Sequence, residues 1–559
     1  MPPKQQRESV PTPTTTSSRG NNAPPAGIVP NRLKIIQLLG CLAVVAAWLL
    51  GRGGSGGSSS SHIASKDAFH RGTFPSHITL SDNQLIVPMP LPIHTRFRQL
   101  SVVRAKSVLP SSPPETSETQ SRSAYAQLAR TQRMPVLMNE TLADQWTARK
   151  EWDLRSGNLT KTLKQVKVYR QSQNRRFFTT FHDNKPMEPL LATKRWQDYN
   201  AQVAVAPSVV LKDNTDGVFL YFTSAIDLLK ERETLLRDLQ GLEQLQVSDE
   251  GRVSNLWIGR RGIVTSTHYD ATFNFFVQLR GRKRFTLLPP STSMYLYPCL
   301  HPHYGHAQVN ISSLNPQAEL VNFPGFARAE VYTAELGPGD MLYLPPFWFH
   351  QVETLEPDSL SVNAWSDAPE YSVMLDVYSM PVPFESHWSQ TGTVFAAMLL
   401  ISKLVEDVHA QHSLHWFAPA PAADTAAPVA RFMAMLVEQR YRRLYASGEM
   451  LQNATLYSQV EGTCASVLTA SHIQTSATLL YRQLLEWDTG LSSPDVLNGE
   501  LDPARLASAV AALSNAFGKI ADSAIRTTLF MNYIEHLVNA VLGAASVHPF
   551  FVNCFLLVQ

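Results

Sequence analysis

Apolar and polar positions follow two different patterns along this chain, and the change between them predicts its organisation. From about Ser121 to Met380, aromatic and β-branched runs alternate with Gly and Pro turns, which is typical of a β-rich domain. After Pro381 the apolar residues recur every three or four positions, which indicates helices. We therefore expect a β-rich domain over residues 121–380 and a helical C-terminal domain over residues 381–559.

Two apolar stripes carry the helical prediction. The first consists of Ile473, Ala477, Leu480, Leu484 and Trp487, and the second of Leu506, Val510, Leu513, Phe517 and Ile520. Asp502-Pro503 precedes the second stripe and is typical of a helix N-cap followed by its first residue. Amphipathic helices bury their apolar stripe against a partner. We therefore expect these helices to pack on the β-rich domain or on a second subunit, in which case the protein is a homodimer.

The N-terminal part of the chain predicts a membrane attachment. Residues 1–34 are rich in Pro, Ser, Thr and Gln, as in disordered tails. Ile35 to Leu50 is free of charge and comes close to the roughly 20 residues that a membrane span needs. Basic residues are more frequent before this segment than after it, which places the N-terminus in the cytosol. Residues 35–51 are thus predicted to be a transmembrane signal anchor.

This anchor would place the catalytic part in the lumen of the ER or Golgi. A flexible linker or stem over residues 52–120 would separate the two, because Gly51 to Ser61 reads GRGGSGGSSSS. A cleaved signal peptide, which leaves a secreted or lumenal protein, and a buried core helix are the alternatives. The sequons are compatible with a lumenal body; they begin at Asn139, Asn158, Asn310 and Asn453.

Composition excludes some classes of protein. The 559 residues carry a formal net charge of only +2, which argues against a protein that coats nucleic acid, and we expect no nucleic-acid partner. The four cysteines are scattered without a CxxC pair, which argues against a zinc ribbon or a disulfide scaffold.

The segment from Gly262 to Pro290 contains a candidate metal site. Its second half reads as two short strands joined at Arg280-Gly281. Residues two apart on a regular strand share a face, so His268, Asp270 and Asn274 would point the same way. His350, in LGPGDMLYLPPFWFH, supplies a third ligand. Two histidines and one carboxylate form the facial triad of non-haem iron(II) oxygenases. Zinc is less favoured, because catalytic zinc usually leaves a single open position.

Lys283 follows His268 by fifteen residues and would lie on the neighbouring strand. A cation there suits the distal carboxylate of an oxo-acid co-substrate. The alternative is a solvated basic hairpin that also contains Arg280, Arg282 and Arg284. A further histidine cluster occurs in HPHYGH, but its spacing suits no standard metal helix, and its Pro and Gly predict an irregular loop; its members are His301, His303 and His306.

These motifs resemble those of the JmjC, or cupin-like, hydroxylases, over roughly Val168 to Pro369. Among them the chain looks closest to the asparaginyl hydroxylase that inhibits hypoxia-inducible factor. By this resemblance the iron ligands and catalytic residues are His268, Asp270 and His350, and the 2-oxoglutarate contacts are Lys283, Thr265, Asn274, Asn363 and, more loosely, Tyr221. Apolar neighbours, namely Phe275, Phe349 and Trp365, would shield the site or serve as core aromatics.

The resemblance implies an α+β fold in which a double-stranded β-helix of the jelly-roll type is flanked by helices. It also implies an Fe(II)- and 2-oxoglutarate-dependent dioxygenase that uses O2, releases succinate and CO2, and hydroxylates a side chain of a protein or peptide. Demethylation of methylated Lys or Arg by the same chemistry and a non-catalytic scaffold are the alternatives, with a metal-dependent cupin isomerase as a weaker one. The C-terminal helical region is much longer than the dimerisation helices of the asparaginyl hydroxylase.

Overall fold

The computed structural model describes residues 97–109, 123–155, 158–163, 166–171, 202–211, 219–300, 304–311, 316–385, 388–415, 427–446, 502–543 and 546–556. The predicted tail, the predicted anchor, most of the stem and the apolar stripe from Ile473 to Trp487 lie outside the described residues.

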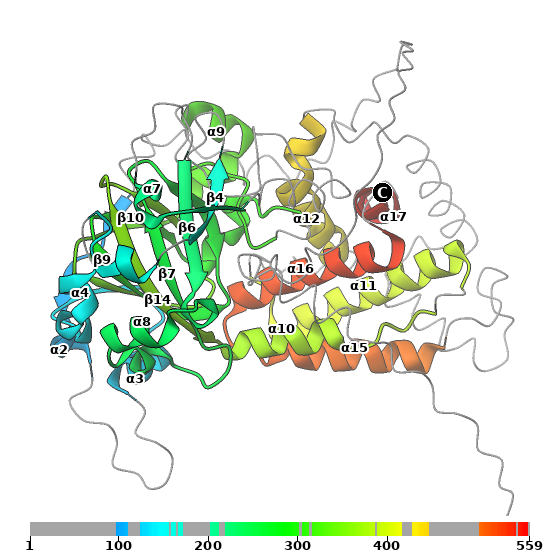
Figure 1. Cartoon of the computed structure of the whole chain (residues 1–559). Coiled ribbons are helices and arrows are strands. Elements are labelled where there is room, and N and C mark those ends of the chain that lie inside the picture. The colour runs from blue at the N-terminus through cyan, green and yellow to red at the C-terminus, as the bar shows by residue number, and fades with distance from the viewer. Residues whose placement is uncertain are drawn as a thin grey trace, which may run out of the picture.

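Eight consecutive strands form a jelly roll of two facing sheets (Figure 1). They are β7 (Val253–Gly259), β8 (Val264–Tyr269), β9 (Thr272–Arg280), β10 (Lys283–Leu288), β11 (Val331–Leu336), β12 (Met341–Leu344), β13 (Phe349–Thr354) and β14 (Ser359–Asp367). One sheet has the order β12-β9-β14-β7 and the other the order β11-β10-β13-β8, with every pair antiparallel. The predicted jelly roll and its α+β class are thus confirmed.

Shorter strands extend both sheets at their edges. The additional strands are β1 (Phe97–Gln99), β2 (Val102–Arg104), β3 (Val136–Asn139), β4 (Val166–Gln171), β5 (Gln202–Val205) and β6 (Phe219–Ala225). Strand β1 pairs with β11 in the smaller sheet. In the larger sheet β2 and β3 continue beyond β12, and β6, β4 and β5 continue beyond β7. Since β6 lies directly beside β7, it contributes to the wall of the jelly roll.

Short helices cover the outer face of the larger sheet. They are α2 (Ala105–Val108), α3 (Ala124–Thr131), η4 (Leu142–Gln145), α4 (Thr147–Glu151), α5 (Asn158–Thr162), α7 (Pro207–Val210), η5 (Ile226–Leu228), α8 (Arg232–Asp238) and η6 (Leu242–Leu245). Helix α3 begins where the hydroxyl of Ser123 accepts a hydrogen bond from the N–H of Ala126, as an N-cap does. The core between helices and sheet includes Trp146, Trp152 and Phe275, all fully buried.

Longer helices cover the outer face of the smaller sheet (Figure 1). They are α10 (Pro369–Ser379), α11 (Gln390–His412), α12 (Ala427–Ala446), α15 (Pro503–Gly518), α16 (Ser523–Leu542) and α17 (Val547–Phe555), with η7 (Pro290–Leu296), α9 (Pro316–Asn322) and η8 (Pro324–Arg328) in the connection between β10 and β11. One apolar core runs from Leu288 and Phe349 of the sheet to Leu400 and Phe530 of the helices. We call these six long helices the C-terminal bundle.

The helices were expected to pack on the β-rich domain or on a second subunit. The bundle packs on the β-rich domain of the same chain. Asp502 caps α15 by accepting a hydrogen bond from the N–H of Ala504, and Pro503 is the first residue of the helix. The stripe from Leu506 to Ile520 is fully buried. Both features of the second predicted helix are confirmed. Within the described part of the chain, no helix alone is long and apolar enough to span a membrane; α16 and α17 pass only as a pair bent by 105°.

The hairpin between β9 and β10 turns at Gly281, as predicted. Gly281 has a φ of +67°, and a Cβ atom there would lie 2.0 Å from the carbonyl oxygen of Asp358. Only glycine tolerates this turn without strain. One prediction about the preceding strand is wrong: His268, Asp270 and Asn274 do not share a regular strand. Strand β8 ends at Tyr269, and Asn274 lies on β9 in the opposite sheet.

Candidate metal centre

Three side chains from two strands and the bend between sheets converge inside the jelly roll. His268 lies near the end of β8, Asp270 follows in the bend, and His350 lies on β13. The antiparallel register places His350 directly opposite His268. Their ligand atoms all lie within 4.8 Å of one another. The departure from a regular strand is what brings the carboxylate of Asp270 between the two imidazoles.

Backbone carbonyl groups orient both imidazoles. Nδ1 of His268 lies 2.8 Å from the carbonyl oxygen of Ser266, and Nδ1 of His350 lies 3.0 Å from that of Trp348. A carbonyl oxygen can only accept, so each Nδ1 donates, and each Nε2 is the nitrogen left to ligate a metal. The two Nε2 atoms lie 3.8 and 3.6 Å from the carboxylate oxygens of Asp270. This arrangement points three donor atoms at one position.

The electrostatics of the cluster fit a divalent cation. Burial, followed by the neighbouring His268, lowers the pKa of His350 to about 4, so this imidazole is neutral at physiological pH and can ligate a metal. Oδ2 of Asp270 is buried and has no hydrogen-bond partner. A buried carboxylate oxygen without a donor is costly unless a cation compensates it. Two imidazoles and one carboxylate with such an orphaned oxygen are suitable ligands for Fe(II).

A strained residue holds the bend that carries Asp270. Phe347 has a φ of +63°, which is unusual for a residue with a bulky side chain. Its N–H donates to the carbonyl oxygen of Asp270 at 2.8 Å. The strained turn at the entrance to β13 is thereby fastened to the bend after β8. Such strain is concentrated at functional sites, where the surrounding structure enforces it.

Lys283 is buried deeper in the same interior. Its side chain is 1% exposed, and its Nζ donates to the hydroxyl of Ser361 at 2.9 Å. The ammonium also lies 5.1 Å from the ring centroid of Phe276 and 5.8 Å from that of Tyr221. Burial lowers its pKa to about 7, and no acidic side chain of the described residues offsets this shift. A buried ammonium without a counter-ion is a suitable binding group for an anion.

The arginines of the hairpin behave differently. Arg282 is exposed and Arg284 half-buried, and they form ion pairs with Glu356 and Glu335 respectively. The alternative of a solvated basic hairpin therefore describes these arginines, whereas Lys283 points to the interior. On β10, Leu287 pairs with His350 and Lys283 lies four residues earlier, about 13 Å along the strand. A long side chain together with a short dicarboxylate can span that interval.

The other predicted contact residues line the same interior. The hydroxyl groups of Tyr221 and Thr265 are hydrogen-bonded to each other, and burial raises the pKa of Tyr221 well above its usual value. Nδ2 of Asn363 donates to Oδ1 of Asn274 at 3.1 Å, and Oδ1 of Asn363 accepts from Nε1 of Trp257 at 2.7 Å. The five predicted contact residues thus form two groups, Lys283 with Tyr221 and Thr265, and Asn363 with Asn274.

Ser361 and Trp257 belong to the site but were not predicted from the sequence. Ser361 could have been found by alternation, since it lies two residues before Asn363 on β14 and shares its face. Trp257 carries no such signal, because its contact with Asn363 depends on the pairing of β7 with β14. Among the predicted aromatics, Phe275 and Phe349 lie in the two outer cores. Trp365 packs edge-on against Trp257.

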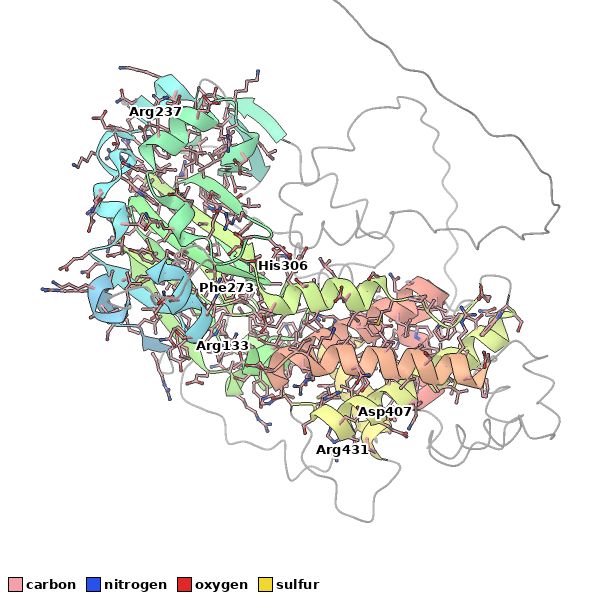
Figure 2. The ribbon with its side chains drawn as sticks, turned by 90° about the horizontal axis from the view of Figure 1, so that it is seen from below. Arg133, Arg237, Phe273, His306, Asp407 and Arg431 are labelled. Atoms are coloured by element: carbon pink, nitrogen blue, oxygen red, sulfur yellow. The ribbon has the colours of Figure 1, made fainter. Side chains whose placement is uncertain are left out.

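The HPHYGH motif contributes one described histidine, since His301 and His303 lie outside the described residues. His306 forms a β-bridge with His268, and their rings stack with centroids 5.3 Å apart. Figure 2 places His306 at the boundary between the jelly roll and the C-terminal bundle. Among the described residues, the only group of three or more potential ligands is His268, Asp270 and His350.

The central part of this chain is similar in sequence to known proteins. Residues 123–371 match the family model of the cupin-like domain. The human protein HSPB1-associated protein 1 is 34% identical over 155 residues, which cover 27% of this chain and 30% of that protein. Jumonji C domain-containing protein 5 of Drosophila melanogaster is 30% identical over 151 residues, which cover 25% and 36%. Lysine-specific demethylase JMJ31 of Arabidopsis thaliana is 34% identical over 182 residues, which cover 31% and 30%.

The chain therefore contains a cupin-like domain with JmjC proteins among its relatives, and that domain includes all eight predicted site residues. The chain spans about a third of the length of these relatives. The expected closeness to the asparaginyl hydroxylase stays a prediction, because none of these matches tests it.

Proposed function

We propose that this chain is an Fe(II)- and 2-oxoglutarate-dependent oxygenase that hydroxylates a side chain of a protein or peptide. The observation that carries the proposal is the pair of complementary sites inside one jelly roll. One is a cluster of two histidines and an aspartate whose buried carboxylate oxygen has no hydrogen-bond donor. The other is the buried ammonium of Lys283, on which no acidic side chain of the described residues acts.

The residues have distinct roles in this proposal. His268, Asp270 and His350 would hold Fe(II), which with 2-oxoglutarate and O2 supplies oxidative hydroxylation with release of succinate and CO2. Lys283 would bind the distal carboxylate of 2-oxoglutarate, and Ser361 orients its ammonium. Tyr221 and Thr265 place hydroxyl groups beside this cation. Trp257, Asn363 and Asn274 fix a polar wall by two side-chain hydrogen bonds.

Demethylation of methylated lysine is the second candidate, because one relative carries the name lysine-specific demethylase. The same residues would serve that reaction, and only the substrate would differ. The scaffold alternative is disfavoured, because all three ligands are present and share one position. Incubating the enzyme with matched unmodified and methylated peptides distinguishes the reactions: hydroxylation adds 16 Da, whereas demethylation removes 14 Da.

The lumenal location is also a proposal. Besides the apolar segment over residues 35–51, it is supported by Cys554 of α17, which is disulfide-bonded. Disulfides persist in oxidising compartments and are rare in the cytosol. Asn158 begins an exposed sequon, so we expect glycosylation there that endoglycosidase removes from wild type. The variant Asn158→Gln should lack that glycan. Absence of glycan from every sequon, together with a fully reduced Cys554, would argue for a cytosolic domain. A homodimer through the C-terminal bundle stays a prediction.

The proposed function is tested by 2-oxoglutarate binding to the full-length chain in detergent, loaded with Mn(II) as an inert substitute for iron. We expect metal-dependent binding in calorimetry, with loss of binding in His268→Ala and a Kd increase of about 30-fold or more in Lys283→Ala. Arg282→Ala, an exposed neighbour of Lys283, is the matched control and should bind as wild type does. A folded wild type that binds no 2-oxoglutarate would refute the oxygenase and favour the scaffold.

A further inference from the structure

Tyr269 lies between two of the candidate metal ligands in sequence but points the opposite way. Because side chains alternate along β8, His268 faces the interior of the jelly roll and Tyr269 faces outward. The Tyr269 side chain is buried in the core that joins the smaller sheet to the C-terminal bundle. Its hydroxyl accepts a hydrogen bond from Nδ2 of Asn532 on α16, at 2.9 Å, across 263 residues of sequence.

Asn532 is itself held by a buried polar network of the bundle. Arg440 of α12 donates to Oδ1 of Asn532 and forms an ion pair with Glu535 at 2.5 Å. The hydroxyl of Tyr441 donates to the other carboxylate oxygen of Glu535 at 2.8 Å. All four residues are at most 1% exposed. Hydrogen bonds of this kind are directional and act in a low dielectric, so the network fixes the position of the Asn532 amide.

The ring of Tyr269 connects this network to both ligand-bearing segments. It packs against Phe347 and Phe349, with ring centroids 5.3 and 5.0 Å apart. Phe347 donates its N–H to Asp270, and Phe349 immediately precedes His350. A shift of Tyr269 would therefore displace the backbone that presents His268, Asp270 and His350 together.

We propose that Asn532 is a positioning residue of the metal centre, and that it acts through Tyr269. The C-terminal bundle thereby becomes part of the site, although it contributes no ligand to the group of three. The inference rests on the metal site of the proposed function. It extends that site by a chain of side-chain contacts that runs from α12 and α16 to the ligands, and no local sequence motif predicts these contacts.

The test compares Tyr269→Phe with Ser293→Ala in the full-length chain. Tyr269→Phe removes only the hydroxyl that Asn532 holds. Ser293→Ala is the matched control, because the hydroxyl of Ser293 makes a buried contact of 2.7 Å with that of Thr528, also on α16. Both variants therefore remove one buried hydroxyl that contacts α16. Only Tyr269 is adjacent to ligands.

Two measurements are made on each variant: the Kd for Mn(II), by electron paramagnetic resonance, and backbone hydrogen exchange over residues 264–272 without metal. For Tyr269→Phe we expect a Kd increase of about three- to tenfold, below the 10–100-fold typical of a direct partner of a ligand, and faster exchange of that segment. Ser293→Ala should leave both unchanged. Asn532→Ala should act as Tyr269→Phe does; if it fails to fold, Tyr269→Phe decides alone.

The possible failures are distinguishable. If wild type binds Mn(II) and Tyr269→Phe matches Ser293→Ala in both measurements, the positioning role is overturned and the proposed function stands. If folded wild type binds no Mn(II), both are overturned.

Discussion

Among the described residues, two cationic side chains are almost completely buried, one in each main region, and their surroundings differ. Arg440 in the C-terminal bundle is paired with Glu535 and bonded to Asn532. Lys283 in the jelly roll has a hydroxyl partner, Ser361, and no acidic side chain among the described residues acts on it. Burying a charge is costly unless a counter-charge compensates it. The bundle supplies a counter-charge to Arg440 itself, whereas the described part of the jelly roll supplies none to Lys283, and in the proposed function a ligand would provide it.

This difference separates a charge that is compensated within the protein from one that is left for a ligand to compensate. A compensated charge contributes to a defined arrangement of helices, and its loss should be visible mainly in stability. An uncompensated buried charge destabilises the ligand-free protein, and such charges are concentrated at functional sites, where a ligand of opposite charge compensates them. The two regions therefore predict opposite consequences when the cation or its partner is removed.

The largest effect is expected in the bundle. Glu535→Ala leaves the guanidinium of Arg440 buried without a counter-charge, which should lower the free energy of unfolding by about 3–5 kcal/mol. Chemical denaturation followed by circular dichroism measures it. The control is Glu385→Ala, which breaks the exposed ion pair with Arg505 and should cost at most about 1 kcal/mol. Equal losses in the two variants would remove the distinction between compensated and exposed pairs.

The jelly roll should respond in the opposite sense. Lys283→Met removes a buried charge and keeps the length of the side chain, so the ligand-free protein should be at least as stable as wild type. Binding of 2-oxoglutarate should nevertheless weaken by about 2–5 kcal/mol, because the ligand carboxylate loses its cation. Denaturation and calorimetry on the same preparation measure both. A variant that loses stability in proportion to binding would identify Lys283 as a structural residue.

The β-rich domain, the three metal ligands and Lys283 could be predicted from the sequence because their signals are local, whereas the jelly roll and the other contact residues were predicted from the family resemblance. The HxD motif, the strand alternation and the turn at Gly281 depend on neighbours within a few residues. The capped helix after Asp502 is likewise local. The contacts that support the site are not local: Trp257 reaches Asn363 across 106 residues and Tyr269 reaches Asn532 across 263. Strand register and helix packing determine them, and no spacing along the chain contains that information.

The geometry of the ligands shows the same limit. Alternation assigned His268 and Asp270 to one face of a regular strand, but β8 ends between them. A strand ends where its backbone hydrogen bonds pass to other partners, and here the carbonyl of Asp270 bonds to Phe347 across the turn. Phe347 itself has a positive φ that its residue type does not predict.

A smaller effect is expected from pH. Burial lowers the pKa of Lys283 from its ordinary value to about 7, so between about pH 7 and pH 10.5 the unfolded chain binds a proton that the folded chain does not. The contribution of Lys283 to stability should therefore rise with pH through this window, by at most about 1.4 kcal/mol per unit. Affinity for 2-oxoglutarate should fall over the same range, since the neutral amine binds carboxylate poorly.

Lys283→Met is the control for the pH experiment, because it removes the titrating group. The difference in unfolding free energy between wild type and Lys283→Met should change with pH above 7 and stay constant below it. Parallel pH profiles of the two proteins would show that Lys283 does not titrate in this window.

The smallest effect is expected from substitution of Arg284, the residue after Lys283 in sequence. Arg284 shares strand β10 with Lys283 but points to the opposite face, where it is 43% exposed and bonds to Glu335 at 2.7 Å. Water already solvates this charge, so Arg284→Ala should cost about 0.2–1 kcal/mol in denaturation and leave 2-oxoglutarate affinity unchanged. If calorimetry instead showed a loss as large as that of Lys283→Met, the ligand would recognise the basic hairpin as a whole. A single strand would then carry two functional cations on two faces, and burial without a counter-charge would no longer distinguish the binding residue from its neighbours.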